Sequence, residues 1–222
     1  MEEFIFFHDY TILILVFIIV AVFLVIVQLV RGGIIRLGVQ ENQFIESIWT
    51  LLPGVVLVFL AVPSLSLLYM LEEDRDSSLT IKALGHQWYW SYEVHEFENP
   101  LVFDSYMEGG ESFRNFRLLD VDNRLVLPYS IPIRVMISSM DVLHSWTVPC
   151  MGVKADACPG RINQVQFSSH RSGVFYGQCS EICGRNHRFM PIVIEVVSLE
   201  DYINWCLNWK ISLLKCKLVR LK

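Results

Sequence analysis

The stretch Gly177-Gln-Cys-Ser-Glu-Ile-Cys-Gly-Arg-Asn-His-Arg-Phe-Met-Pro191 gathers four candidate metal ligands in one short segment. They are Cys179, Cys183, His187 and Met190, spaced as C-x3-C-x3-H-x2-M. Thiolate and thioether sulfurs are soft donors, and beside imidazole they favour copper over hard cations. Zinc also binds Cys and His, but it has little use for methionine. The stretch therefore predicts a copper loop, with Met190 as the residue that separates copper from zinc.

A fifth candidate ligand, His144, lies upstream in the sequence Asp141-Val-Leu-His144-Ser-Trp. A mononuclear blue-copper site uses one Cys, two His and a weak axial Met, whereas this chain offers a second Cys. Two bridging thiolates would use every donor, giving each of two copper ions one imidazole and leaving Met190 as a weak ligand. We therefore expect a two-copper cluster. Such a cluster suits electron transfer, since substrate chemistry would need an open coordination position and none is evident.

The residues around this loop have the pattern of a β domain. From about Ile81 to Val197, short β-branched and aromatic runs are separated by Gly, Pro, Asn and Asp. This pattern predicts an antiparallel sandwich or barrel, in which the metal loop joins the last two strands and His144 comes from an earlier strand end. The clearest runs are residues 124–127, 131–137, 164–167, 173–176 and 191–197.

The N-terminal third has the composition of a membrane protein. The chain is 53% hydrophobic, and Tyr10–Val30 and Ile48–Leu71 are 21 and 24 residues without a charge. Each exceeds the roughly 20 residues that a helix needs to cross a bilayer. A buried core helix is the alternative for either segment, but length and absence of charge argue against it. Pro53 and Pro63 lie inside the second segment, where we expect partner subunits to pack against the helix.

Basic residues predict the orientation of this transmembrane hairpin. Arg31 and Arg36 are the only basic residues before Arg75, so the loop between the helices is expected inside and both termini outside. Glu46 is expected just before the second helix begins. A carboxylate at that depth is costly, which favours a proton-pathway role, although a solvated side chain at the bilayer edge fits equally.

The C-terminal segment predicts an amphipathic helix. Ser198-Leu-Glu-Asp201 has the form of a capping box, and apolar residues alternate with Lys and Arg from residue 202 to 222. The helix would dock on the β domain or lie near lipid headgroups. The predicted domains are therefore residues 1–75 for the transmembrane hairpin, 76–198 for the β domain and 199–222 for the helix and basic tail.

Charge is concentrated in one half of the β domain. Residues 72–122 contain twelve acidic and four basic side chains, a net of −8, whereas the whole chain carries −5. An acidic face favours a basic soluble partner and disfavours nucleic acid. A merely solubilising acidic surface is the alternative.

The cysteines leave two other functions open. Cys179 and Cys183 could act as a transient pair in a membrane-anchored copper chaperone or thiol oxidoreductase, or they could join the histidines in a structural zinc site. Of the remaining four cysteines, Cys150 and Cys158 could pair in a disulfide. Cys206 and Cys216 are expected to be small hydrophobic residues of the terminal helix.

Residues 177–191 closely resemble the copper loop of cytochrome c oxidase subunit II. Three further segments resemble that family: residues 85–92 its aromatic segment, residues 156–163 its turn before the loop, and residues 46–53 the start of its second helix. The resemblance covers nearly the whole chain. It implies a cupredoxin-like Greek-key domain holding the dinuclear copper A centre. The implied ligands are the side chains of His144, Cys179, Cys183, His187 and Met190 and the backbone carbonyl of Glu181.

The resemblance also implies roles outside the copper ligands. The Glu181 carboxylate would help to hold a magnesium ion shared with subunit I, and Glu46 matches a carboxylate at the mouth of a proton channel. Trp88 matches the surface tryptophan where an electron from cytochrome c enters, although it could be one of several alternately buried aromatic residues of a strand. Docking carboxylates are expected, as a group, at Glu93, Asp104, Asp122 and Asp141.

The function implied by the resemblance is that of an electron-accepting subunit in a terminal oxidase. It would take single electrons from cytochrome c and pass them to the haem and copper sites of subunit I, where oxygen is reduced to water and protons are pumped. The absence of a signal peptide or transit sequence favours a chain made inside an organelle. The expected location is the mitochondrial inner membrane, with both termini and the copper domain in the intermembrane space.

Overall fold

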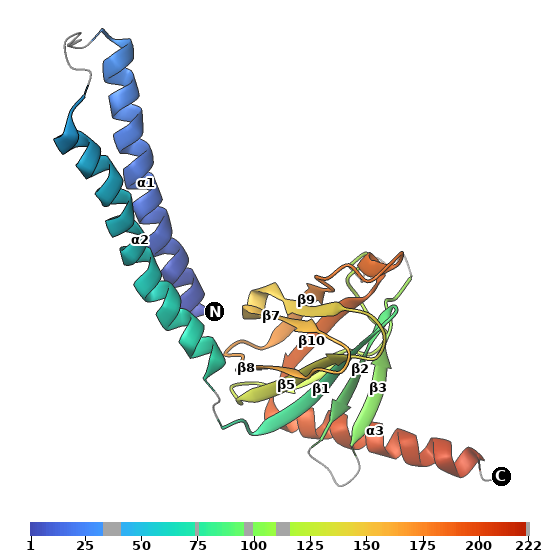
Figure 1. The fold of residues 1–222 in the computed structure, drawn as a ribbon. Coiled ribbons are helices and arrows are strands. Elements are labelled where there is room, and N and C mark those ends of the chain that lie inside the picture. The colour runs from blue at the N-terminus through green and yellow to red at the C-terminus, as the bar shows by residue number, and fades with distance from the viewer. Residues whose placement is uncertain (33–40, 74–75, 96–99, 110–115, 221–222) are drawn as a thin grey trace. The chain divides into compact units, whose positions relative to one another are not determined.

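The computed structural model describes residues 1–32, 41–73, 76–95, 100–109 and 116–220 (Figure 1). The chain divides into two compact units, Met1–Glu73 and Asp74–Lys222. The first unit is helical and the second is built on β-strands. Arg36, on which the predicted orientation depends, lies outside the described residues, so the orientation stays a prediction.

The first unit consists of α1 (Glu2–Val30) and α2 (Gln43–Glu72), both longer than the uncharged segments predicted. The second helix begins early because the Asn42 side chain accepts a hydrogen bond from the Ile45 amide at 3.2 Å, the usual role of an N-cap asparagine. Glu46 therefore lies in the first turn of α2 and not before the helix. Its carboxylate is favoured there by the positive end of the helix dipole.

Neither helix of this unit buries a residue within the chain. Both are long and apolar enough to cross a membrane. The Tyr10 hydroxyl donates to the Phe59 carbonyl at 3.2 Å, a contact between the two helices, and α2 continues through Pro53 and Pro63. A surface this apolar needs lipid or protein to cover it.

In its described residues, the second unit contains two larger sheets and a hairpin. One sheet has the order β3-β2-β1-β5-β8 and the other has the order β4-β10-β9, while β6 and β7 pair with each other. The strands are β1 (Leu79–His86), β2 (Tyr89–Val94), β3 (Leu101–Ser105), β4 (Leu125–Pro128), β5 (Ile133–Ser139), β6 (His144–Val148), β7 (Val153–Ala157), β8 (Asn163–Phe167), β9 (Gly173–Gln178) and β10 (Pro191–Val197).

The sheets are mixed, which corrects the expectation of an antiparallel sandwich or barrel. The pairs β1 with β5 and β4 with β10 are parallel, and the other pairs are antiparallel. A parallel pair needs a long crossover connection, which residues 87–132 provide between β1 and β5. The five predicted runs fall on β4, β5, β8, β9 and β10. Alternation of apolar and polar side chains predicts where a strand lies, but it does not predict whether the neighbouring strand runs parallel or antiparallel to it.

The core lies between the sheets. Alternate residues of β1 and β5 are buried, as expected of strands with one covered face, whereas β4 and β6 are buried along their whole length. Trp90 and Trp146 are the largest fully buried side chains, and the metal-loop residues Cys179, Cys183 and Met190 belong to the same buried cluster. The candidate site is therefore anchored in the hydrophobic core.

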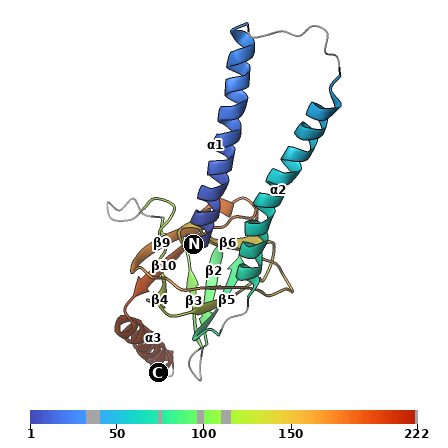
Figure 2. The same cartoon turned by 90° about the vertical axis from the view of Figure 1, so that its left-hand side faces the viewer.

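The terminal helix α3 (Leu199–Arg220) docks on this domain beside β3 and β4 (Figures 1 and 2). The Ser198 hydroxyl accepts a hydrogen bond from the Asp201 amide, which is one half of the predicted capping box, and it donates to the Asp201 carboxylate. Trp205 and Trp209 both contact the Phe103 ring, and Cys206 is fully buried as a small apolar residue. Of the two alternatives predicted for this helix, its described side chains therefore show docking on the β domain and not a place near lipid headgroups. The side chain of Cys216 lies outside the described residues.

Candidate metal centre

The metal loop lies between β9 and β10, the antiparallel neighbours predicted to carry it. Cys179 follows directly after β9, and Met190 stands directly before β10. Gly184, at the middle of the loop, has a φ of +121°, and a Cβ there would lie 3.2 Å from the Trp88 ring. Only glycine adopts this backbone readily, so Gly184 allows the loop to reverse close against Trp88.

His144 begins β6 and is completely buried. Its Nε2 lies 2.8 Å from a carboxylate oxygen of Asp141, and its Nδ1 lies 3.9 Å from the Cys179 sulfur. A carboxylate on one imidazole nitrogen is the usual way to fix the ring so that the other nitrogen faces a metal. The ring also needs Gly85, because a Cβ at that position would lie 2.8 Å from the imidazole.

The remaining candidate ligands close around the two cysteines. The Cys183 sulfur lies 3.4 Å from His187 Nδ1 and 3.5 Å from the Met190 sulfur, and the Cys179 sulfur lies 3.3 Å from the Glu181 carbonyl. Donor atoms of His144, Cys179 and Cys183 lie within 4.8 Å of one another. Each thiol therefore has one imidazole beside it, so the structure brings together all the ligands named from the sequence.

The electrostatics of the two thiols favour a bound cation. Burial opposes ionisation of Cys179, but hydrogen bonds from His144 and from the backbone lower its pKa overall. For Cys183, burial and the negative charge of Cys179 both raise the pKa. Two buried thiolates this close repel each other unless positive charge lies between them. The soft, partly buried donor set fits copper chemistry.

Trp88 lies in the two-residue turn between β1 and β2, not within a strand, which corrects the alternative of an alternating aromatic strand. Its indole N–H donates to the Cys183 carbonyl at 3.2 Å. The Gln87 side-chain amide donates to the same carbonyl at 2.8 Å. The buried aromatic residues of β2 are Trp90 and Tyr92 instead. Trp88 is therefore in direct contact with the backbone of a candidate ligand.

Two positioning residues escaped the sequence reasoning. Gln87 was not singled out, although it contacts the metal loop through its side chain and donates its backbone N–H to Asp141 at 2.6 Å. Asp141 was predicted only as a docking carboxylate, yet it also bonds His144. The signal available was its position three residues before a candidate ligand histidine. Gln87 supports the metal loop through a contact with Cys183, which lies 96 residues further along the chain. The sequence gives no signal for a contact at that distance.

The four predicted docking carboxylates are spread over the domain. Glu93 pairs with Lys82 at 3.0 Å, and this hydrogen bond lowers the pKa of Glu93. Asp104 and Asp122 are exposed, and Asn123 links them. Its backbone N–H donates to the Asp122 carboxylate, and its side-chain amide donates to the Asp104 backbone carbonyl. Asp141 alone among the four has a described contact with the turn that holds Trp88. Their joint role in docking stays a prediction.

The other predicted residues have plainer surroundings. The Glu181 side chain is half-buried in the metal loop, and its role in binding magnesium stays a prediction. Cys150 lies in the turn of the β6–β7 hairpin and Cys158 follows β7 at the hairpin's other end. Both are free thiols, so the disulfide considered between them is absent from the structure.

These features define a class of protein: a cupredoxin-like β domain with a candidate copper site, joined to two membrane-length helices. The profile of the cytochrome c oxidase subunit II periplasmic domain matches residues 79–197, and that of its transmembrane domain matches residues 1–67. The chain belongs to the cytochrome c oxidase subunit II family, as the resemblance predicted.

Individual relatives agree with this assignment. Cytochrome c oxidase subunit 2 of Acheta domesticus is 53% identical over 209 residues, which cover 94% of this chain and 92% of the relative. The protein of the same name from Choristoneura rosaceana is 53% identical over 211 residues, with the same coverage. The crystal structure of the periplasmic domain of subunit II of Bradyrhizobium japonicum cytochrome oxidase is 44% identical, with a TM-score of 0.58. The match covers 62% of this chain and 97% of that domain.

Proposed function

We propose that this chain accepts single electrons from cytochrome c and delivers them to the haem and copper sites of subunit I, where oxygen is reduced to water and protons are pumped. The observation that carries the proposal is the paired arrangement at the loop. Each of two buried cysteines stands beside its own imidazole, with the Met190 sulfur and the Glu181 carbonyl completing the set.

The residues of the loop fit two copper ions. Cys179, Cys183, His144 and His187 would hold them, with Met190 and the Glu181 carbonyl as the weaker ligands. When bound, the ions would supply a site that takes up and releases one electron with little structural change. The protein holds its ligands in place beforehand through the Asp141 bond to His144 and the burial of the sulfurs, which keeps rearrangement small.

Trp88 is the proposed point where the electron enters. Its half-buried indole reaches from the β1–β2 turn to the Cys183 carbonyl, so one hydrogen bond connects the domain surface with a copper ligand. The acidic carboxylates Glu93, Asp104, Asp122 and Asp141 would attract the basic face of cytochrome c, at a range limited by salt to about 8 Å.

Further parts of the proposal concern the membrane complex. The Glu181 carboxylate would bind magnesium at the boundary with subunit I, whose other ligands would come from outside this chain. Glu46, in the first turn of α2, would lie at the mouth of a proton channel. The proposed location is the mitochondrial inner membrane, with both termini and the copper domain in the intermembrane space. The proposed domains are residues 1–75 for the transmembrane hairpin, 76–198 for the copper domain and 199–222 for the terminal helix and basic tail.

Copper content and electron paramagnetic resonance of the full-length chain test the proposal. Two retained coppers per chain, with hyperfine structure from an electron shared by two copper nuclei, are expected. One labile Cu(I) would support a copper chaperone, and a colourless, silent site holding zinc would support a structural role. Either result would overturn the proposed relay, and so would a fully active enzyme with Cys179 and Cys183 in a disulfide.

A further inference from the structure

Two strands from different sheets approach each other closely beside the metal centre. Gly177 of β9 lies so near Thr147 of β6 that a Cβ at position 177 would be 1.9 Å from the Thr147 carbonyl oxygen. A little further on, the Ser180 amide donates to the Ser145 carbonyl at 3.1 Å. These two backbone contacts bracket Cys179 in the sequence. Backbone therefore meets backbone at the point where the metal loop begins.

The close approach at position 177 requires glycine, the residue without a Cβ. Nonbonded heavy atoms prefer a separation of roughly 3.5–4.0 Å, so a methyl group here would force the two strands apart by more than about 1 Å. The atom that it would meet belongs to the backbone of Thr147, so no side-chain rotation makes room for it. The bonds of a metal site, by contrast, hold to within about 0.2 Å of their preferred lengths. The displacement therefore exceeds what such a site absorbs.

The same close approach lies between the strands that carry one pair of candidate ligands. His144 is the first residue of β6, and Cys179 follows β9 directly. The Cys179 sulfur lies 3.9 Å from His144 Nδ1. If β6 yielded to a methyl group at position 177, His144 would move with it, and if the end of β9 yielded, Cys179 would move. In either case the separation of this imidazole and this thiol would change.

A second glycine limits the position of the same imidazole. Gly85 of β1 lies against the ring, and a Cβ there would be 2.8 Å from His144 Cδ2. We propose that Gly177 and Gly85 are positioning residues that together set the separation of His144 and Cys179 for two copper ions. This inference rests on the proposed function, because it assigns both glycines to the copper pair.

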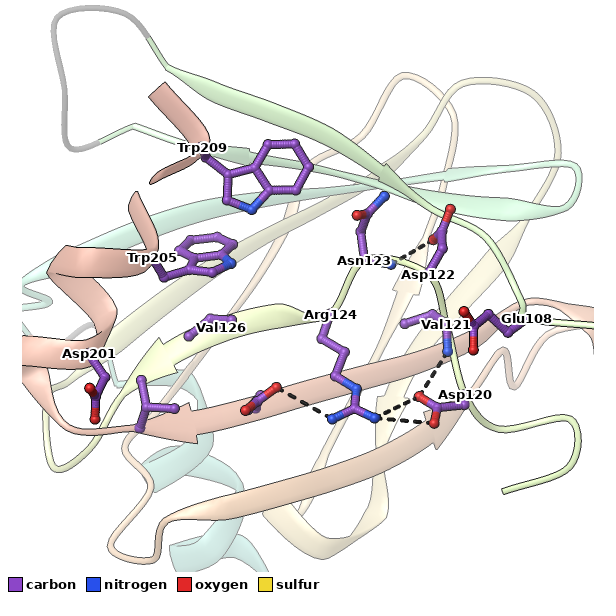
Figure 3. A pocket seen from close by; sticks show the side chains of 12 residues that line it. Glu108, Asp120, Val121, Asp122, Asn123, Arg124, Val126, Asp201, Trp205 and Trp209 are labelled. Atoms are coloured by element: carbon purple, nitrogen blue, oxygen red, sulfur yellow. Dashed lines mark hydrogen bonds and ion pairs between the residues drawn. The ribbon is translucent and has the colours of Figure 1, made fainter. Parts of the chain in front are cut away.

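The strand at the other end of the metal loop is anchored separately. The loop ends at β10, which pairs with both β9 and β4. Arg124 lies directly before β4, in the pocket beside Trp205 between α3 and the strands β4 and β10 (Figure 3). Its guanidinium bonds both carboxylate oxygens of Asp120 at 3.2 Å and lies 3.5 Å from Glu195 of β10. This ion pair ties β10 to β4, away from β6.

The candidate ligands near β10 should therefore stay in place when position 177 changes. The Cys183 sulfur lies 3.4 Å from His187 Nδ1 and 3.5 Å from the Met190 sulfur, and neither contact involves β6. One thiolate, one imidazole and one thioether are most of the donor set of a mononuclear copper site. Displacing His144 from Cys179 should thus leave a site for a single copper ion.

Gly177→Ala in the full-length chain tests this inference. Copper content should fall from two ions per chain to one, and paramagnetic resonance should show hyperfine structure from a single copper nucleus. Affinity for the second copper, measured by competition with a chelator, should fall by about 100-fold, the upper end for residues that orient metal ligands. Gly109→Ala is the matched control, because a Cβ there would meet no atom of the described residues within 4 Å.

Gly85→Ala is the second variant, and it decides the question if Gly177→Ala does not fold. Its added methyl group meets a side chain, so the imidazole can turn away while the backbone of the domain stays in place. Circular dichroism of the copper-free chain should therefore be unchanged, whereas the signal of an electron shared by two copper nuclei should weaken. A folded variant with an altered copper signal separates a positioning role from a merely structural one.

The outcomes distinguish the two proposals. A shared-electron copper pair with unchanged affinity in either folded variant would overturn the role of the glycines, and so would an equal loss of copper in Gly109→Ala. Absence of a copper pair from the unchanged protein would contradict the proposed function itself, and this inference with it.

Discussion

The metal loop and the helical hairpin differ in where their structure is decided. In the first unit, α1 and α2 bury no residue within the chain, so their helical form follows from composition and local hydrogen bonds alone. At the metal centre, by contrast, all five residues of β6 are buried, and the carbonyl of Cys183 is held by Gln87 and Trp88 from a distant segment. A function built from long-range contacts is sensitive to single substitutions, whereas a lipid-facing helix tolerates many of them.

The largest effect is expected at the centre of the metal site. Cys179→Ser removes one of the two proposed bridging sulfurs, so the dinuclear centre should be lost and electron transfer abolished, because a hydroxyl is a poor ligand for copper. Metal analysis and paramagnetic resonance of the purified chain measure this. Cys150→Ser, at an exposed free thiol outside the loop, is the control and should keep full copper. Retention of a shared-electron copper pair in Cys179→Ser would contradict the ligand assignment.

Removing the partner of a ligand should have a smaller effect than removing the ligand. Asp141→Ala takes away the carboxylate 2.8 Å from His144 Nε2, and copper affinity should fall by about 10- to 100-fold, as is typical for residues that orient metal ligands. Asp141→Asn keeps an oxygen acceptor and should restore part of the loss. Competition with a copper chelator measures both variants, and equal affinity in Asp141→Ala and the unchanged protein would show that His144 needs no support.

Trp88→Ala should slow the arrival of electrons without removing the metal. The turnover number with cytochrome c should fall by about tenfold, equivalent to about 1.4 kcal/mol of activation free energy, while KM changes less. Steady-state kinetics of the complex separate these two parameters. Tyr89→Ala, in the neighbouring position but outside the contact with Cys183, is the comparison. A change in KM alone would assign Trp88 to docking and not to electron transfer.

The smallest effect is expected in the helical unit. Glu46→Gln should impair proton uptake, with a loss of turnover below about tenfold and an unchanged copper spectrum, because a single relay group at the membrane edge is only one part of a pathway. Proton uptake by the complex in vesicles, measured beside Glu41→Gln as a nearby acidic control, tests it. Normal proton-coupled turnover in Glu46→Gln would leave this residue as a solvated side chain at the start of α2.

Much of this protein could be predicted from local sequence patterns. The spacing of Cys179, Cys183, His187 and Met190 within one loop predicted the types of the candidate ligands, and His144 was proposed because it completes the donor set. The apolar segments predicted both helices of the first unit. The ends of these helices were predicted less well. The Asn42 cap starts α2 at Gln43, several residues before the uncharged run begins.

The sequence by itself determined the three helices, five of the strands and the candidate donor set of the site, because periodicity, capping and ligand spacing act over a few residues. Only the tertiary structure decided which strands pair in parallel, where α3 docks, and which polar groups support the ligands. Gln87 and Trp88 reach Cys183 across almost a hundred residues of chain, and the pocket beside Trp205 forms only when α3 packs on the sheet. Such contacts depend on how buried surfaces fit together, which no local pattern records.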